Sequence, residues 1–159
     1  MIFVTLGSQK FQFNRLLKAI DELVENKQIK DDIFAQIGYS DYKPKNYKYK
    51  EFLDREEFKK SMGRSDIVIT HGGTGAIVGA IKQGKKVIAV PRLAKYEEHV
   101  DDHQLQIIGQ FTEMNLIKAV YDMTELQEAI HSIKEMKFNK YISNTLTIEE
   151  SIEKYIETI

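Results

Sequence analysis

The chain has 159 residues, of which 42% are hydrophobic and 30% charged, with a formal net charge of −1 and no cysteine. This length and composition predict one globular domain, residues 1–159, and the small net charge argues against attraction to nucleic acid or anionic lipid. The lack of cysteine excludes disulfides and thiol chemistry. The apolar run 1–6 is too short for a signal peptide, and no apolar stretch approaches the roughly 20 residues of a membrane span.

Hydrophobic patterning predicts strands that alternate with helices along most of the chain. Short β-branched or alternating runs indicate the strands, and apolar residues at helical spacing indicate the helices. In chain order we expect a strand at 2–6, a helix at 11–26, strands at 33–37 and 47–53, a helix at 55–63, a strand at 66–70, a helix at 74–83, a strand at 87–90, a helix at 101–114, a strand at 116–120 and a helix at 124–136.

The C-terminal segment 144–159 is predicted to be an amphipathic helix. Thr147 and Glu150 form the capping-box pattern at its start, and isoleucines recur on one face from Ile148 to Ile159. This helix either closes the domain or contacts a partner, and the sequence favours neither role.

Alternating strands and helices predict an α/β fold, a Rossmann-like, doubly wound parallel sheet covered on both faces. In the strand order 3-2-1-4-5-6 the winding reverses between the first and fourth strands, and ligands bind there, beyond the carboxyl ends of the strands. Glycine-containing loops follow both of these strands, at 7–9 and 71–75. We therefore expect the two loops to meet in one crevice.

The loop His71-Gly-Gly-Thr-Gly75 leads from a predicted strand into a predicted helix that begins near Thr74. Glycines let the backbone approach a ligand closely, and the free N–H groups of a first helical turn attract anions. The loop lacks the Gly-Lys-Ser/Thr of a P-loop and the spacing of G-x-G-x-x-G, so a plain strand-to-helix turn is the alternative. The position of the loop in the crevice favours a phosphate-bearing ligand. Arg92 could neutralise the charge of this ligand, and the alternative is that Arg92 is a solvated surface residue.

Acidic, imidazole and amide side chains crowd into residues 97–104, Glu-Glu-His-Val-Asp-Asp-His-Gln. Such a set of donors and acceptors suits sugar hydroxyls, which is the interpretation we favour. A charged helix start capped by Asp101 or Asp102 is the main alternative. A metal bound by His99, His103 and Asp102 is the least favoured, because no H-E-x-x-H pattern supplies a further ligand.

Four segments, 1–9, 71–75, 85–92 and 98–104, resemble the C-terminal domain of glycosyltransferase family 28. Across nearly the whole chain the sequence looks most like the stand-alone form of this domain, the donor-binding subunit of two-component glycosyltransferases. Examples of that form are the subunit that adds N-acetylglucosamine to dolichol diphosphate and bacterial subunits of capsule and exopolysaccharide synthesis. The resemblance implies the C-terminal, donor half of a GT-B fold, a UDP-sugar as substrate, and no cofactor or metal.

By position, the resemblance also implies roles for individual residues. Backbone groups at Phe52 and Leu53 would meet uracil, and Asp102 and Gln104 would meet sugar hydroxyls. Together with the residues chosen above, the candidate substrate-binding set is Gly7, Ser8, Gln9, Phe52, Leu53, His71, Gly72, Gly73, Thr74, Gly75, Arg92, Glu98, His99, Asp102, His103 and Gln104. His71 and Gln104 are the candidate catalytic residues.

One departure from the family pattern concerns the helix after the glycine loop. Related enzymes commonly carry a glutamate there that holds the ribose hydroxyls, and the corresponding position in this chain is Gly79. Ribose binding is therefore expected to come from elsewhere, with Glu97 and Glu98 as candidates, or to be weaker.

The function expected from these observations is that of a UDP-sugar hexosyltransferase active with a partner subunit. This chain would bind the donor, and a membrane-anchored subunit would bring a lipid-linked saccharide acceptor in bacterial capsule or exopolysaccharide biosynthesis. The chain would then be cytoplasmic and peripheral at the inner membrane face, and an exposed half-cleft would favour self-association of the lone chain. The alternative is a non-catalytic, nucleotide-binding accessory protein that activates a partner transferase.

Overall fold

The computed structural model of this chain describes residues 1–141, so the helix predicted at 144–159 lies outside the described residues. The described residues form one parallel sheet with the strand order β3-β2-β1-β4-β5-β6, which confirms the predicted doubly wound order. Its strands are β1 Ile2–Thr5, β2 Ile33–Gln36, β3 Lys48–Lys50, β4 Ile67–His71, β5 Lys86–Val90 and β6 Lys118–Ala119.

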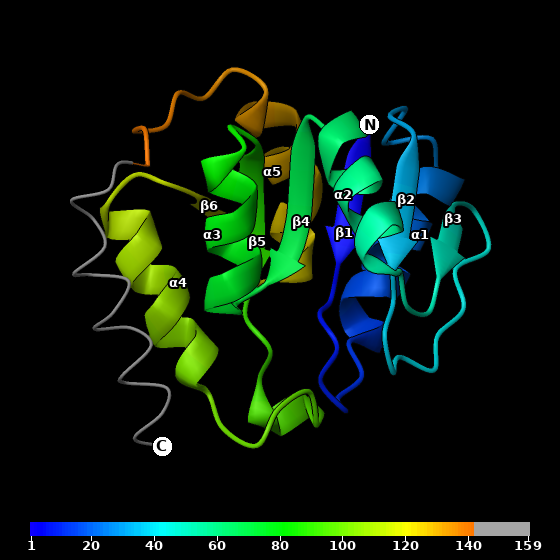
Figure 1. Cartoon of the computed structure of the whole chain (residues 1–159). Helices are drawn as coiled ribbons and strands as arrows, with labels where there is room; N and C mark the ends of the chain where they lie inside the picture. Colours follow the sequence, from blue (N-terminus) through cyan, green and yellow to red (C-terminus); the bar gives the residue numbers. More distant parts are fainter. Residues whose placement is uncertain (142–159) are drawn as a thin grey trace.

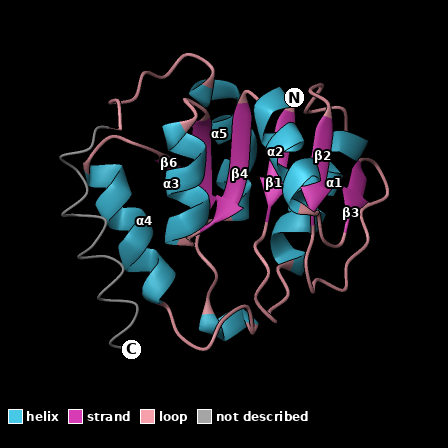
Figure 2. Cartoon of the chain, viewed as in Figure 1, coloured by secondary structure: helices cyan, strands magenta, loops and turns pink. Residues whose placement is uncertain are grey.

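Helices cover both faces of the sheet (Figures 1 and 2). They are α1 Asn14–Glu25, α2 Arg55–Arg64, α3 Thr74–Lys82, α4 His103–Glu113 and α5 Leu126–Ile133, with short 3-10 helices η1 Ala94–Tyr96 and η2 Met123–Glu125. Helices α1 and α5 pack on one face, and α2, α3 and α4 pack on the other. No helix within residues 1–141 is long and apolar enough to cross a bilayer.

Each central strand supplies side chains to both apolar layers. In β1, Ile2 and Val4 belong to the cluster beneath α1 and α5, whereas Phe3 belongs to the cluster beneath α2, α3 and α4. The same alternation in β4 places Val68 with Phe3. A strand buried on both faces has no polar side to show, which explains why these segments read as continuous apolar runs.

Several elements are shorter than the sequence predicts. The first helix begins at Asn14 instead of residue 11, after a loop that connects it to β1. The third strand ends at Lys50 instead of residue 53, because Asp54 forms a capping box that starts α2 almost at once. The predicted helix at 124–136 is divided into η2 and the shorter α5.

The connection from β2 to β3 contains no helix, and Asp21 of α1 holds this loop in place. The Asp21 carboxylate accepts hydrogen bonds from the Tyr42 hydroxyl at 2.7 Å, Lys45 N at 2.9 Å and Asn46 N at 2.8 Å. Burial alone would raise the pKa of Asp21, but these hydrogen bonds outweigh it and lower the pKa below its ordinary value. The Asp21 carboxylate thus fixes the conformation of this helix-free connection.

Replacing Asp21 with alanine is expected to destabilise the protein by roughly 3 kcal/mol, because two backbone N–H groups and a tyrosine hydroxyl lose a charged acceptor. Urea denaturation of Asp21→Ala, with the exposed Glu22→Ala on the same helix as control, measures this loss. Equal stability of the two variants would contradict the role of Asp21.

Candidate functional site

The loops after β1 and β4 meet in one pocket of about 570 Å³ at the carboxyl ends of the strands. In Figure 1 strands β1 and β4 point downwards, and the loops that follow β1 and β5 lie at the lower edge of the molecule. Residues Gly7, Ser8 and Gln9 line one side of the pocket, and residues 71–76 line another. The third side comes from residues 99–101 and from His103, Gln104 and Ile107 of α4. Ser8 and Thr74 therefore share one pocket, as the fold rule leads us to expect.

The imidazole of His71 fills a space that two glycines leave open. A Cβ atom added at Gly7 would lie 2.8 Å from His71 Nε2, and one added at Gly73 would lie 2.3 Å from His71 Cε1. Gly7 also has a φ of 74°, in the left-handed region that favours glycine. The two glycine loops therefore contact each other through this ring, which fixes the floor of the pocket.

Gln104 connects three segments around the pocket. Its Oε1 accepts hydrogen bonds from Gly72 N and Arg92 N, both at 2.9 Å, and its Nε2 lies 3.2 Å from His71 Nδ1. Because Oε1 has two N–H donors, Nε2 must be the amide nitrogen that donates to His71 Nδ1. The neutral imidazole then carries its proton on Nε2.

Burial keeps His71 neutral. It lowers the pKa of His71 to about 3, and the positive charge of the nearby Arg92 adds to the effect. With Nδ1 occupied by Gln104, this ring presents Nε2–H as a hydrogen-bond donor and offers no free nitrogen as a general base. The Oε1 atom of Gln104 accepts hydrogen bonds from the protein backbone and Nε2 donates one to His71, so one N–H of the amide remains for a ligand.

The first turn of α3 forms the anion-binding wall of the pocket. Gly73 is the N-cap residue and has no side chain to accept hydrogen bonds from the N–H groups of the first turn. The Thr74 hydroxyl is buried and has no hydrogen-bond partner among the described residues. Free N–H groups, the helix dipole and an unused hydroxyl together suit a phosphate oxygen.

Arg92 does not line this pocket, although the sequence made it a candidate for neutralising a diphosphate. Its side chain is buried and donates to four backbone carbonyl oxygens, those of Leu6, Phe11, Gln12 and Glu98. Burial lowers the pKa of Arg92 to about 10, against an opposing effect of Glu98, so the guanidinium stays charged at neutral pH. Arg92 therefore holds the β1–α1 loop and the β5–α4 loop together from inside.

Glu98 is likewise buried and lies outside the pocket lining. Its carboxylate accepts two hydrogen bonds from Arg15 of α1, both at 3.0 Å, and one from Leu93 N at 3.1 Å. This bidentate pair anchors the β5–α4 loop to α1. Glu98 is thus already paired with Arg15, and neither it nor Glu97 lines the pocket.

Asp101, rather than Asp102, organises the two histidines of this wall. Asp101 Oδ1 lies 3.1 Å from His99 Nδ1 and 3.1 Å from His103 Nδ1, and it accepts a hydrogen bond from His103 N at 3.0 Å. Asp102 instead accepts from Ala94 N at 2.8 Å and does not line the pocket. Within residues 1–141 no group of three histidine or acidic side chains is arranged to hold a metal ion.

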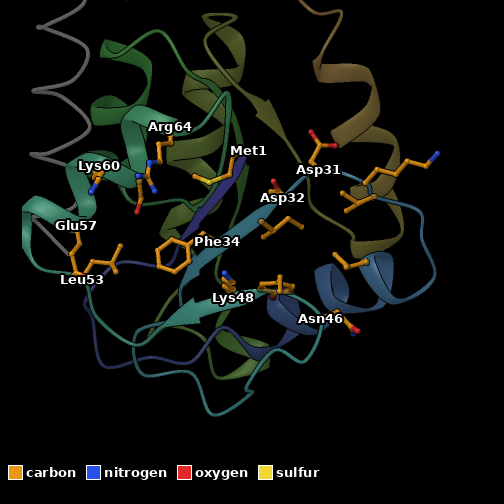
Figure 3. Close-up of a pocket in the computed structure, with 16 residues that line it drawn as sticks. Met1, Asp31, Asp32, Phe34, Asn46, Lys48, Leu53, Glu57, Lys60 and Arg64 are labelled. Carbon is orange, nitrogen blue, oxygen red and sulfur yellow. The ribbon is translucent and has the colours of Figure 1, made fainter.

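Phe52 and Leu53 lie away from the pocket lined by the glycine loops. The Phe52 ring is exposed and packs edge-on against Tyr39 at 5.1 Å between ring centroids. Leu53 lines a different and larger cavity of about 780 Å³, between α2 and the β2–β3 edge (Figure 3). That cavity has mixed charges and no glycine loop, and the start of α2 beside it is already capped by Asp54, so we place the functional site at the smaller pocket.

The structure also shows site residues that the sequence did not single out. Ala76, Val100 and Ile107 line the pocket, and Asp101 was considered only as a helix cap. Ile107 could have been found, because it lies one helical turn after His103 on the same face of α4. At Gly79, the position where the family resemblance implies a glutamate, an added Cβ would meet no atom within 4 Å.

Comparison with known proteins identifies the family. A family model described as the glycosyltransferase family 28 C-terminal domain matches residues 1–159. A Candida albicans protein named UDP-N-acetylglucosamine transferase subunit ALG13 is 25% identical over 138 residues, which cover 85% of this chain and 45% of that protein. This chain therefore spans less than half the length of that relative.

Solved structures show the same fold. The solution structure of ALG13 matches with a TM-score of 0.61 and 17% identity, over 95% of this chain and 94% of that one. The glycotransferase of kitacinnamycin matches with a TM-score of 0.61 and 13% identity, over 97% of this chain and 38% of that one. The match to part of a larger glycosyltransferase agrees with the predicted half of a GT-B fold.

The depressed pKa of His71 predicts how stability changes with pH. The unfolded imidazole takes up a proton below about pH 6.5 whereas the folded one does not, so stability falls as the pH falls from about 6.5 towards 3. Between pH 7 and pH 5 the wild type should lose about 2 kcal/mol more than His71→Gln. Urea denaturation at both pH values measures the difference, with exposed His131→Gln as control. Identical losses in wild type and His71→Gln would contradict a buried neutral His71.

Proposed function

Since this chain belongs to the family of the glycosyltransferase family 28 C-terminal domain, we propose that it binds a UDP-sugar and is the donor-binding, catalytic subunit of a two-component hexosyltransferase. The observation that carries the proposal is the pocket in which the β1 loop meets the uncapped first turn of α3. This pocket offers uncharged donors to an anion and lies at the fold's ligand-binding edge.

The diphosphate of the donor would lie against the start of α3. The free N–H groups of this turn and the Thr74 hydroxyl would donate to phosphate oxygens, because none of them has another acceptor among the described residues. Charge accumulates on the diphosphate as the sugar departs, so donors fixed in this geometry stabilise the leaving group in the transition state. Burial of Thr74 within a rigid helix keeps the hydroxyl in place before the ligand arrives.

The sugar would occupy the remaining sides of the pocket, and the nucleoside would extend out of it towards Phe52, which lies outside the lining. Ser8 and Gln9 on one side and His99 and His103 on the other offer donors and acceptors to hexose hydroxyls. The backbone near Phe52 is the proposed contact for uracil, as the family resemblance implies. Which hexose is transferred depends on the orientation of single hydroxyls, which these residues leave open.

The acceptor and the base would come from a second protein. The described residues form one α/β domain, and a GT-B reaction takes place between two such domains. His71 has no free nitrogen to act as a base, which supports a base supplied by the partner. We propose a membrane-anchored partner with a lipid-linked saccharide acceptor, and exopolysaccharide or capsule synthesis at the inner membrane face as the setting.

The same lack of a free base favours a second candidate function. A nucleotide-binding accessory protein that activates a complete transferase would need the pocket and no catalytic group of its own. In that case the partner alone would transfer sugar, and this chain would only increase the rate.

The first test is the binding of UDP and UDP-hexoses by calorimetry. Thr74→Val keeps the shape of the side chain but removes the unused hydroxyl, so we expect nucleotide affinity to fall about tenfold with no loss of folding stability. Thr112→Val, whose hydroxyl donates within α4, is the control outside the pocket. No binding of any of these nucleotides to the wild type, alone or with its partner, would refute the proposed function.

The second test distinguishes a catalytic subunit from an accessory protein. Labelled hexose is transferred from UDP-hexose to the lipid fraction of membranes that contain the partner, with and without this chain. A catalytic subunit predicts no transfer without the chain and about tenfold slower transfer with Thr74→Val at subsaturating donor. Substantial transfer by the membranes alone would support the accessory protein instead.

A further inference from the structure

The pocket that would receive the diphosphate contains no lysine or arginine among the described residues that line it. The side chains in this lining that can carry a positive charge are those of His71, His99 and His103. A diphosphate diester brings two negative charges, and helix N–H groups offer only partial charges in return. The described lining therefore lacks a permanent positive charge to compensate the diphosphate.

Two nearby arginines are already committed to other partners. Arg92 donates to backbone carbonyl oxygens inside the protein, and Arg15 forms a bidentate ion pair with the buried Glu98. His71 is also unsuitable, because it is buried and its Nδ1 accepts from Gln104. Of the described lining residues that can carry a positive charge, this leaves His99 and His103, both of which lie beside Asp101.

The arrangement around Asp101 suits two imidazolium ions. Its Oδ1 lies 3.1 Å from Nδ1 of both His99 and His103, in hydrogen-bond geometry for His99 and at ion-pair distance for His103. A second proton on either ring adds a positive charge beside this carboxylate and makes both ring nitrogens donors. Imidazole is the side chain that makes this change between pH 5 and 8.

We propose that His99 and His103, oriented by Asp101, take up protons when the diphosphate binds, so that binding of the nucleotide-sugar is linked to pH. This inference rests on the proposed function and adds to it the origin of the positive charge. Asp101 acts as a positioning residue, because it reaches the ligand only through the two histidines. With Asp101 ionised, uptake of both protons changes the formal charge of the lining side chains from −1 to +1.

Charged and titratable groups on several elements surround the two rings. In their own loop, Asp101 and Asp102 are acidic, and Asp102 lies outside the lining. Beneath them lie His71 of β4, which stays neutral, and the buried cation Arg92 at the end of β5. Glu98 is paired with Arg15 of α1, the first turn of α3 carries no charged side chain, and the Phe11 ring packs 5.2 Å from His99.

Calorimetry in buffers with different ionisation enthalpies counts the protons taken up on binding. UDP-glucose, UDP-galactose and UDP-N-acetylglucosamine are the probes, because their diphosphate diesters do not titrate between pH 6 and 8 and cannot themselves supply the signal. For any of them that binds, we expect net proton uptake at pH 7.5 and an affinity about tenfold or more higher at pH 6 than at pH 8. Binding without proton uptake and with the same affinity at both pH values would overturn the inference and leave the proposed function intact.

Variants assign the signal to these residues. The double variant His99→Gln, His103→Gln should bind more weakly at pH 6 and lose the proton uptake, whereas His131→Gln, an exposed histidine outside the pocket, should keep it. Asp101→Asn keeps both imidazoles and should reduce the pH dependence. Proton uptake that persists in the double variant would overturn the inference, and failure of all three UDP-sugars to bind the wild type would refute the proposed function itself.

Discussion

The side-chain amide of Gln104 is the interaction on which the rest of the site depends. One oxygen atom accepts from the backbone just after β4 and from the backbone just after β5, so it fixes the separation of two neighbouring strand ends. Its nitrogen orients His71, and that ring separates the two glycine loops. An amide suits this place because it combines an acceptor for two N–H groups with a donor to an imidazole. Removal of either function would leave buried polar groups without partners.

Buried charge plays a structural part around the site. The guanidinium of Arg92 donates to carbonyl oxygens of the β1–α1 loop and of the β5–α4 loop. The ion pair between Arg15 and Glu98 joins α1 to the same β5–α4 loop. Loops carry many backbone groups that no strand or helix pairs, and a planar cation with five N–H donors can satisfy several of them at once. The pocket thereby gains rigid walls, while its lining stays free of permanent positive charge.

The sequence was most informative where one physical cause acts alone. Runs such as Ile67 to Ile69 are buried on both faces, so the strands and their order followed from patterning and the fold rule. The glycine loop after β4 was recognisable for a similar reason, because few other residues fit beside His71. No sequence pattern indicated that the Arg92 side chain is buried, because most of its hydrogen-bond acceptors are backbone carbonyl oxygens of the distant β1–α1 loop. The roles of Asp21 and Asp101 were not predicted either, because the sequence does not distinguish a solvated carboxylate from one that accepts hydrogen bonds from its neighbours.

The close fit of His71 between Gly7 and Gly73 has a consequence for how this fold can vary. A side chain at position 73 requires a smaller residue in place of the imidazole, whereas Gly7 is favoured by its left-handed φ as well as by the ring. Gly7 is distant in the sequence from the other two positions, yet all three meet at the imidazole. In an alignment of relatives, position 73 should carry a side chain only where position 71 is smaller than histidine.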